Sequence, residues 1–227
     1  MWQIKSDSTL EHDVQEELLF DPRVDVKAIT VSAKGGVVTL SGSASTYAGK
    51  VAALHDAERV SGVNVVVDHM DVSLPDLHSR SDADLAKAVI AALHWDVEVP
   101  EGSIRTAVRD GWVTLDGTVD WQYQRTAADG AVRYLTGVKG VTNQIAVAPS
   151  IGPSLEKAVD VKQHIRDALR RSAETDAQRI TVETADGGKA VTLRGTIHSW
   201  AEREEVNRAA WATPGVRKVE DDLTYAV

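Results

Sequence analysis

The sequence predicts an α+β fold made of three tandem αββαβ units, each a three-stranded mixed sheet with two helices packed on one face. Three observations predict it. A Val-Thr-Leu-x-Gly stretch occurs three times, beginning at Val38, Val113 and Val191. A Gly-Val pair follows twenty residues after the glycine of every copy. The copies lie 75 and 78 residues apart in a chain of 227 residues, and such a period indicates repeated structural units.

Each unit is expected to open with an amphipathic helix. In the first unit Ser8-Thr9-Leu10-Glu11 fits a capping box, and Pro22 stops the helix. Apolar residues recur every fourth position between them, which is the spacing of one helix face. The same stripe occurs three times, as Leu10, Val14 and Leu18, as Leu85, Val89 and Leu93, and as Val161, Ile165 and Leu169.

A hairpin, a second helix and a third strand should follow in every unit. Glycine-containing turns separate two short β runs at Gly35-Gly36, Asp110-Gly111 and Asp186-Gly187-Gly188, and so short a connection requires antiparallel strands. The third strand returns after a helix and can run parallel to its neighbour. The second helices are expected at about 48–60, 124–135 and 201–212, and the third strands at 63–72, 138–147 and 216–225.

Two linkers set the domain boundaries. Residues 74–80 and the Pro-rich segment 148–153 separate units expected at 8–73, 81–148 and 154–227. Units of this size have marginally stabilising cores on their own, so we expect them to pack on one another, at least in pairs.

Composition bounds the function. The hydrophobic content of 43% and charged content of 26% are ordinary for a globular protein, and the net charge of −9 disfavours general binding to nucleic acid or anionic membranes. The absence of cysteine excludes disulfides and thiolate metal sites. No 18-residue apolar run or signal peptide is found, so the expected location is the cytoplasm, or the periplasm if a leader precedes this sequence.

Six glycines recur at two places in the unit, and they predict backbone roles. One set should end the second strand, where the backbone must turn or be approached closely. The other should end the second helix, where a residue without Cβ adopts a left-handed conformation cheaply. A phosphate cradle would need a run of glycines between strand and helix, which is absent. The two sets are Gly42, Gly117 and Gly195, and Gly62, Gly137 and Gly215.

These motifs resemble the BON domain family of bacterial osmotically inducible and nodulation-associated proteins. The resemblance rests on Val-Thr-Leu-x-Gly, a helix, and then Gly-Val-x-x-Val, and it covers nearly the whole chain outside the linkers. The stretches 121–125 and 199–203 and Asn143 are also similar to the family. The first unit departs most, with Asp68 where the second has Asn143.

The resemblance implies a non-catalytic, stress- or envelope-associated binding protein of a transport-associated family, which contacts a phospholipid surface or a protein partner. No serine-nucleophile motif, carboxylate pair or metal-ligand cluster stands out, so neither enzyme activity nor a cofactor is expected. Two alternatives stay open: a structural protein that assembles into oligomers, and a sensor of a small ligand or ion such as potassium.

Two sets of residues are candidates for surface or partner binding. Aromatic rings lie just before the second helices at Tyr47, Trp121 and Trp200, where they are suited to a lipid interface or a protein partner. Alternatively they fix the helix entry or join neighbouring units. The second set is a basic stripe on the first helix of the third unit, suited to headgroups or phosphates or simply solvated. It consists of Lys162, Arg166 and Arg170.

Overall fold

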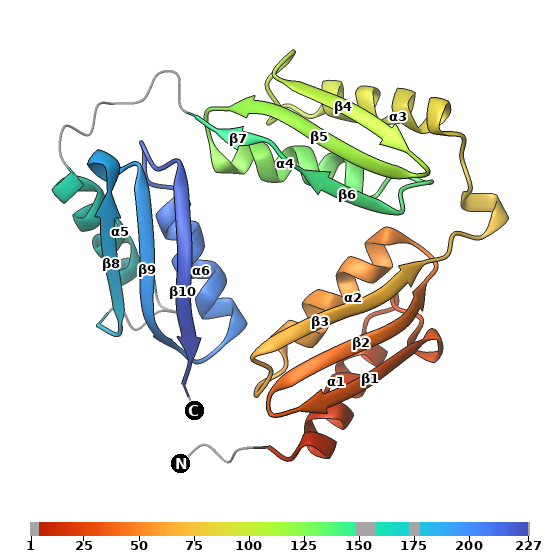
Figure 1. Cartoon of the computed structure of the whole chain (residues 1–227), viewed down its shortest axis with the longest axis horizontal. Helices are drawn as coiled ribbons and strands as arrows, with labels where there is room; N and C mark the ends of the chain where they lie inside the picture. The colour runs from red at the N-terminus through yellow and green to blue at the C-terminus, as the bar shows by residue number, and fades with distance from the viewer. Residues whose placement is uncertain (1–4, 149–157, 173–177, 227) are drawn as a thin grey trace.

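The computed structural model describes residues 5–148, 158–172 and 178–226, and it contains three α+β units arranged in a ring (Figure 1). Each unit has two helices and a three-stranded mixed sheet, which confirms the predicted fold class. Unit 1 contains α1 (Asp7–Phe20), β1 (Ile29–Lys34), β2 (Val37–Ala44), α2 (Tyr47–Arg59) and β3 (Val65–Val72).

The other two units repeat this order. In unit 2 the third strand is split into two short pieces, whereas in unit 3 it is continuous. Unit 2 contains α3 (Asp82–Trp95), β4 (Ile104–Arg109), β5 (Trp112–Val119), α4 (Gln122–Arg133), β6 (Gly140–Asn143) and β7 (Ala146–Val147). Unit 3 contains α5 (Ala158–Arg171), β8 (Ile180–Ala185), β9 (Ala190–Ile197), α6 (Trp200–Trp211) and β10 (Lys218–Tyr225).

The second strand of each unit lies in the middle of its sheet. It pairs antiparallel with the first strand and parallel with the third, as the connection lengths predicted. The register is the same in all three units, because the valine that begins each Val-Thr-Leu stretch pairs with the last valine of the Gly-Val-x-x-Val motif. These pairs are Val38 with Val66, Val113 with Val141 and Val191 with Val219.

Each unit has its own core, between its sheet and its two helices. Successive strand residues point to opposite faces, so Val38 and Leu40 are buried against the helices while Thr39 points away. The predicted stripe of the first helix, Leu10, Val14 and Leu18 in unit 1, is buried in the same core, and its counterparts in units 2 and 3 are buried likewise.

The glycine of the Val-Thr-Leu-x-Gly motif does not end its strand, so that prediction was wrong. β5 runs through Gly117 to Val119, and β2 and β9 likewise continue for two residues. A Cβ on Gly117 would lie 2.2 Å from the backbone oxygen of Ser103, and its φ is +144°. The glycine is therefore needed because the backbone at Ser103 approaches closely, and not because the strand stops.

The first helix also begins earlier than its capping box suggested. Ser6, and not Ser8, is the N-cap, and its hydroxyl oxygen accepts a hydrogen bond from the backbone N–H of Thr9 at 3.2 Å. The Ser8-to-Glu11 spacing matches the motif, but Ser8 is already inside the helix. Ser81 caps α3 in the same way, through the N–H of Asp84.

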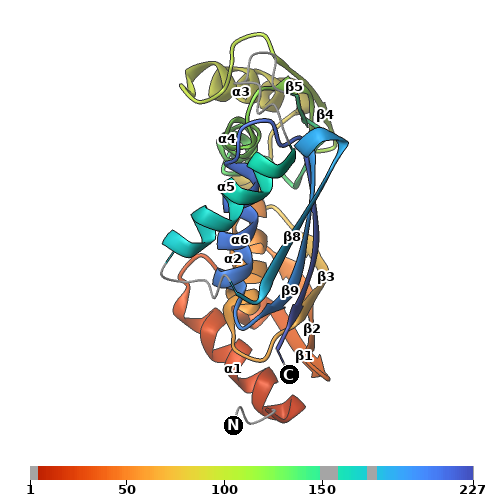
Figure 2. The ribbon, with the colours of Figure 1, turned by 90° about the vertical axis from the view of Figure 1, so that its left-hand side faces the viewer.

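The ring has an inner and an outer set of helices. The second helices α2, α4 and α6 line its inner side, and the first helices α1, α3 and α5 lie along its outer edge (Figure 1). The three sheets lie toward one side of the ring and the helices toward the other (Figure 2). α2 of unit 1 contacts α6 of unit 3, so the two ends of the tandem meet.

We predict that Gly117→Ala lowers the free energy of unfolding by at least about 3 kcal/mol, because the new methyl group collides with backbone and not with a movable side chain. Gly102→Ala is the control. Gly102 also has a positive φ, of +73°, but a Cβ there meets nothing within 4 Å, so a cost of about 1 kcal/mol is expected. Urea unfolding followed by circular dichroism measures both values, and equal losses would contradict the close-approach account.

Candidate functional site

The aromatic residues predicted as binding candidates lie at the boundaries between units, and each is half-buried. Tyr47, the first residue of α2, packs against the core of unit 2. Trp121, the N-cap of α4, lines a groove shared with α6 of unit 3. Trp200, the first residue of α6, lines a cavity of about 400 Å³ with residues of unit 1 that include Val63 and Val65.

These three boundaries form a cycle. The aromatic residue of unit 1 packs against unit 2, that of unit 2 lines a groove with unit 3, and that of unit 3 lines a cavity with unit 1. The units therefore follow one another head to tail around a pseudo-threefold axis, and the contact of α2 with α6 closes the ring (Figure 1). Contact between neighbouring units was the alternative that the sequence left open for these rings. A role for them in lipid or partner binding stays a prediction.

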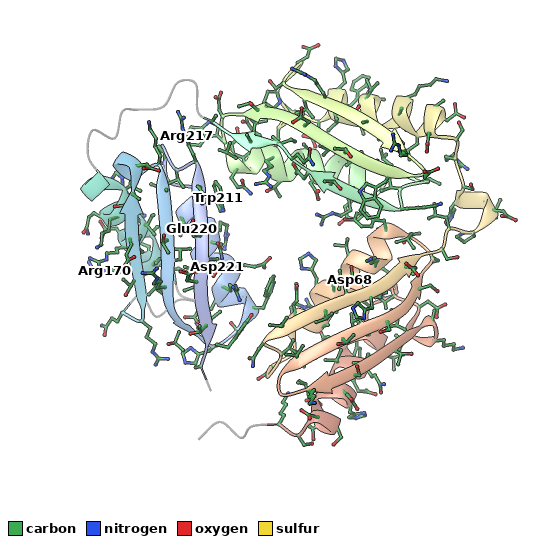
Figure 3. The ribbon with its side chains drawn as sticks, viewed as in Figure 1. Asp68, Arg170, Trp211, Arg217, Glu220 and Asp221 are labelled. Carbon is green, nitrogen blue, oxygen red and sulfur yellow. The ribbon has the colours of Figure 1, made fainter. Side chains whose placement is uncertain are left out.

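A polar clamp ties the second helix of each unit to its third strand. Lys50 Nζ lies 2.8 Å from an Asp68 carboxylate oxygen in unit 1, and Arg203 Nε lies 2.8 Å from Asp221 in unit 3. Figure 3 shows both aspartates on strands at the inner side of the ring. In unit 2 the guanidinium of Arg125 donates to the backbone oxygen of Asn143, and the Asn143 amide donates back to that of Arg125.

The Asp or Asn of the clamp has a second role that is the same in every unit. Its side-chain oxygen accepts the backbone N–H two residues further on, at 2.9 Å from Met70 to Asp68 and at 3.1 Å in units 2 and 3. Asp68 is thus a functional replacement for Asn143, although the sequence comparison marked it as a departure. A carboxylate and an amide both supply this acceptor, whereas only the carboxylate pairs with a cation.

Electrostatics differ between the clamps because only two of them contain a carboxylate. Burial alone raises the pKa of Asp221, but hydrogen bonds from Arg203 and Asn207 outweigh it and hold that pKa below its usual value. The guanidinium of Arg203 also lies 5.8 Å from the ring centre of Tyr225, which is a cation–π distance. The clamp of unit 3 therefore extends to the end of β10.

The predicted basic stripe lies on α5. Lys162 and Arg166 are half-buried, and Arg170 is exposed at the outer edge of unit 3 (Figure 3). A guanidinium nitrogen of Arg170 lies 3.7 Å from an Asp167 carboxylate oxygen, a surface pair of little energetic weight. The stripe is thus accessible at its C-terminal end, and its binding role stays a prediction.

Sequence reasoning did not recognise that exposed residues occupy one equivalent position at the ends of the outer helices. Phe20 is 81% exposed and Trp95 is 84% exposed, and each lies two residues after the last residue of the buried stripe. The corresponding position in unit 3 is Arg171, which is also exposed. The helical spacing alone could have predicted this exposure, because a residue two positions after a buried one points roughly 200° away from the core.

Two inner helices bring titratable groups together where units 1 and 3 meet. Burial, and then the charge of Glu204 on α6, raise the pKa of Glu58 on α2 to about 7, while Arg203 opposes this rise. Burial lowers the pKa of His55, whose Nδ1 lies 3.5 Å from a Glu58 oxygen. Within the described ranges, histidines and carboxylates form no cluster of three or more that could hold a metal ion.

A second carboxyl pair lies within unit 1. Asp56 on α2 is 4% exposed, and burial together with the nearby charge of Asp21 raises its pKa to about 6. Hydrogen bonds from Arg23 lower the pKa of Asp21 to about 2 despite some burial. The folded ring therefore disfavours ionisation of both carboxyl groups, Asp56 and Glu58, although only Glu58 faces another unit.

Comparison with known proteins identifies the family. The family model described as the BON domain matches residues 6–73, 81–149 and 158–227, so the chain belongs to the BON domain family and contains three copies of the domain. It is similar to "Osmotically-inducible protein Y" of Escherichia coli K12, with 31% identity over 143 residues that span 61% of this chain and 71% of that protein.

Solved structures of a type III secretion protein also match. CdsD of Chlamydia trachomatis aligns over 96% of this chain and 92% of its own, at 15% identity and a TM-score of 0.27. The C-terminal domain of the same protein aligns over the full length of both chains with the same identity and TM-score. A score this low supports no inference about function.

We predict that stability falls as pH rises through neutrality, because Glu58 has a folded-state pKa raised above its unfolded value. Its contribution is fully present below about pH 4.5 and is lost as pH passes about 7. Glu58→Gln should therefore raise the melting temperature at pH 8 and change it little at pH 5. Asp56 acts in the same direction, so some pH dependence should persist.

Glu101→Gln is the matched control, since that side chain is 87% exposed. Melting curves for the wild type and both variants across this pH range provide the comparison. Parallel plots of melting temperature against pH for the wild type and Glu58→Gln would show that ionisation of Glu58 does not oppose the contact between units 1 and 3.

Proposed function

We propose that this protein is a non-catalytic binding module of the stressed cell envelope, and that it docks on an anionic phospholipid surface with the helix side of its ring. Membership of the BON domain family and similarity to a protein named as osmotically inducible support the setting. None of the described helices has both the length and the apolar character needed to span a bilayer.

The observation that carries the proposal is the equivalent position at the ends of the three outer helices. Two of these positions hold the exposed aromatic residues Phe20 and Trp95, and the third holds Arg171, next to Arg170. Equivalent residues of units related by a pseudo-threefold axis lie on one side of the ring, here the helix side (Figure 2). Aromatic rings partition into the membrane interface, and arginines pair with anionic headgroups.

The free energies that these side chains can contribute favour reversible docking. Burying a large apolar side chain contributes about 1.5–3 kcal/mol, and each Arg or Lys near an anionic surface contributes about 1 kcal/mol. Two aromatic residues and a few cations therefore suffice for weak adhesion and not for stable insertion. The net charge of −9 opposes docking on an anionic surface, so the attraction must come from the local arginines and must weaken as salt increases.

Other functions stay open as outcomes of the test. A protein partner would use the same exposed residues, an assembly role would show as oligomers in light scattering, and a potassium sensor would show as potassium-dependent melting. The cytoplasmic location, with the periplasm as its alternative, also stays a prediction. The lipid proposal is favoured because aromatic and basic residues share one position of the repeat.

We predict that the wild type floats with phosphatidylglycerol-containing vesicles at low salt and not with pure phosphatidylcholine vesicles. The double variant Phe20→Ser/Trp95→Ser should bind at least about tenfold more weakly, because two interfacial side chains are lost. Trp112→Ser is the matched control. Trp112 is half-exposed on β5 and alternates with the buried Val113, so it lies on the sheet side.

The measurement is a flotation assay with circular dichroism of every variant. Absence of binding at low salt would end the lipid proposal. Equal losses for the double variant and the Trp112→Ser control would show that the helix side is not the docking surface.

A further inference from the structure

A groove of about 1160 Å³ lies between α4 of unit 2 and α6 of unit 3. It is formed by residues from two units and is distinct from the exposed outer-helix ends on which the lipid proposal rests. Three aromatic residues and two unpaired carboxylates line it. They are Trp121, Tyr123 and Trp211, and Glu98 and Glu204.

The aromatic residues come from both walls. Trp121 and Tyr123 belong to the start of α4, and Tyr123 remains 54% exposed. Trp211 is the last residue of α6, on the side of unit 3 that faces unit 2 (Figure 3). Trp211 also packs against the core of unit 2, so its position is fixed by the contact between the units. The groove thus offers aromatic surface from two directions.

The charges on the walls are those of a cation site. Among the described residues, Glu98 and Glu204 form no ion pair. Arg208, the arginine on the groove wall, is already paired with Glu205, which lies three residues earlier on the same helix. The side-chain oxygen of Gln122, also on the wall, is buried without a hydrogen-bond partner in the described structure. The groups that the groove offers to a ligand are therefore hydrogen-bond acceptors and aromatic faces.

We infer that this groove binds a small organic cation of the quaternary ammonium class, free in solution. Such a cation has no N–H to satisfy, and it is attracted to aromatic faces and to carboxylates without strict geometry. An anion is repelled by Glu98 and Glu204, and a neutral apolar molecule gains nothing from them. The volume of the groove exceeds that of a trimethylammonium group, so a cation with a short polar tail also fits.

The test titrates the full chain with choline and with its neutral isostere, in which carbon replaces the nitrogen, and follows tryptophan fluorescence and calorimetric heat. Choline should bind saturably and at least about tenfold more tightly than the isostere, because only the charge differs. Equal affinity for the two, or no saturable binding of choline, would overturn the inference.

Variants locate the site. Tyr123→Leu should weaken choline binding about tenfold, and Glu204→Gln several-fold. Trp211→Leu should also weaken choline binding, but it disturbs the contact between units 2 and 3 as well. Tyr123→Leu, at a half-exposed position, is therefore the decisive variant. Tyr134→Leu, at a 64% exposed position outside the groove, is the matched control and should leave choline binding unchanged. Equal affinity in Tyr123→Leu and wild type would overturn the inference.

Phosphatidylcholine vesicles form the last arm, since they present the same group on a lipid. A fluorescence change with free choline that vesicles do not reproduce supports a cation taken from solution. A change with vesicles alone would overturn it. The lipid proposal is tested separately with phosphatidylglycerol, so either proposal can fail without the other.

Discussion

The ring depends on one arrangement that recurs three times: an aromatic residue at the start of an inner helix lies at the boundary with the next unit. Tyr47 packs against the core of unit 2, and Trp121 and Trp200 each line a space that their unit shares with the next one. A unit of about 70 residues buries too little surface to be very stable alone, and the neighbouring unit supplies the missing apolar surface. Closing the ring gives every unit two neighbours, and α2 of unit 1 contacts α6 of unit 3.

Much of the fold followed from the sequence because its causes are local. Alternation in Val38-Thr39-Leu40 and the four-residue spacing of Leu10, Val14 and Leu18 determine which faces are buried, whatever the rest of the chain does. A close backbone approach at Gly117 was one of the two roles that the sequence predicted, but its partner, Ser103, did not follow from the motif. A motif locates such a glycine, but only the paired backbone shows why it is required.

The candidate sites were harder to predict because they combine residues far apart in the chain. The groove between α4 and α6 joins Glu98 to Trp211, and no spacing rule connects them. Burial raises the pKa of Glu58 most, and the charge of Glu204 from another unit raises it further. By contrast, the exposure of Phe20 and Trp95 follows from helix geometry alone and could have been predicted from the stripe. Contacts between units are therefore the limit of what single-repeat reasoning reaches.

The head-to-tail ring is tested most directly by the distance between units 1 and 3. The chain contains no cysteine, so Ser61→Cys and Thr224→Cys introduce two unique spin-label sites at exposed positions near the α2–α6 contact. Pulsed electron paramagnetic resonance should give one short, narrow distance distribution, which Trp200→Ala broadens. A broad distribution in the otherwise unaltered chain would show that the three units are connected by linkers without closing a ring.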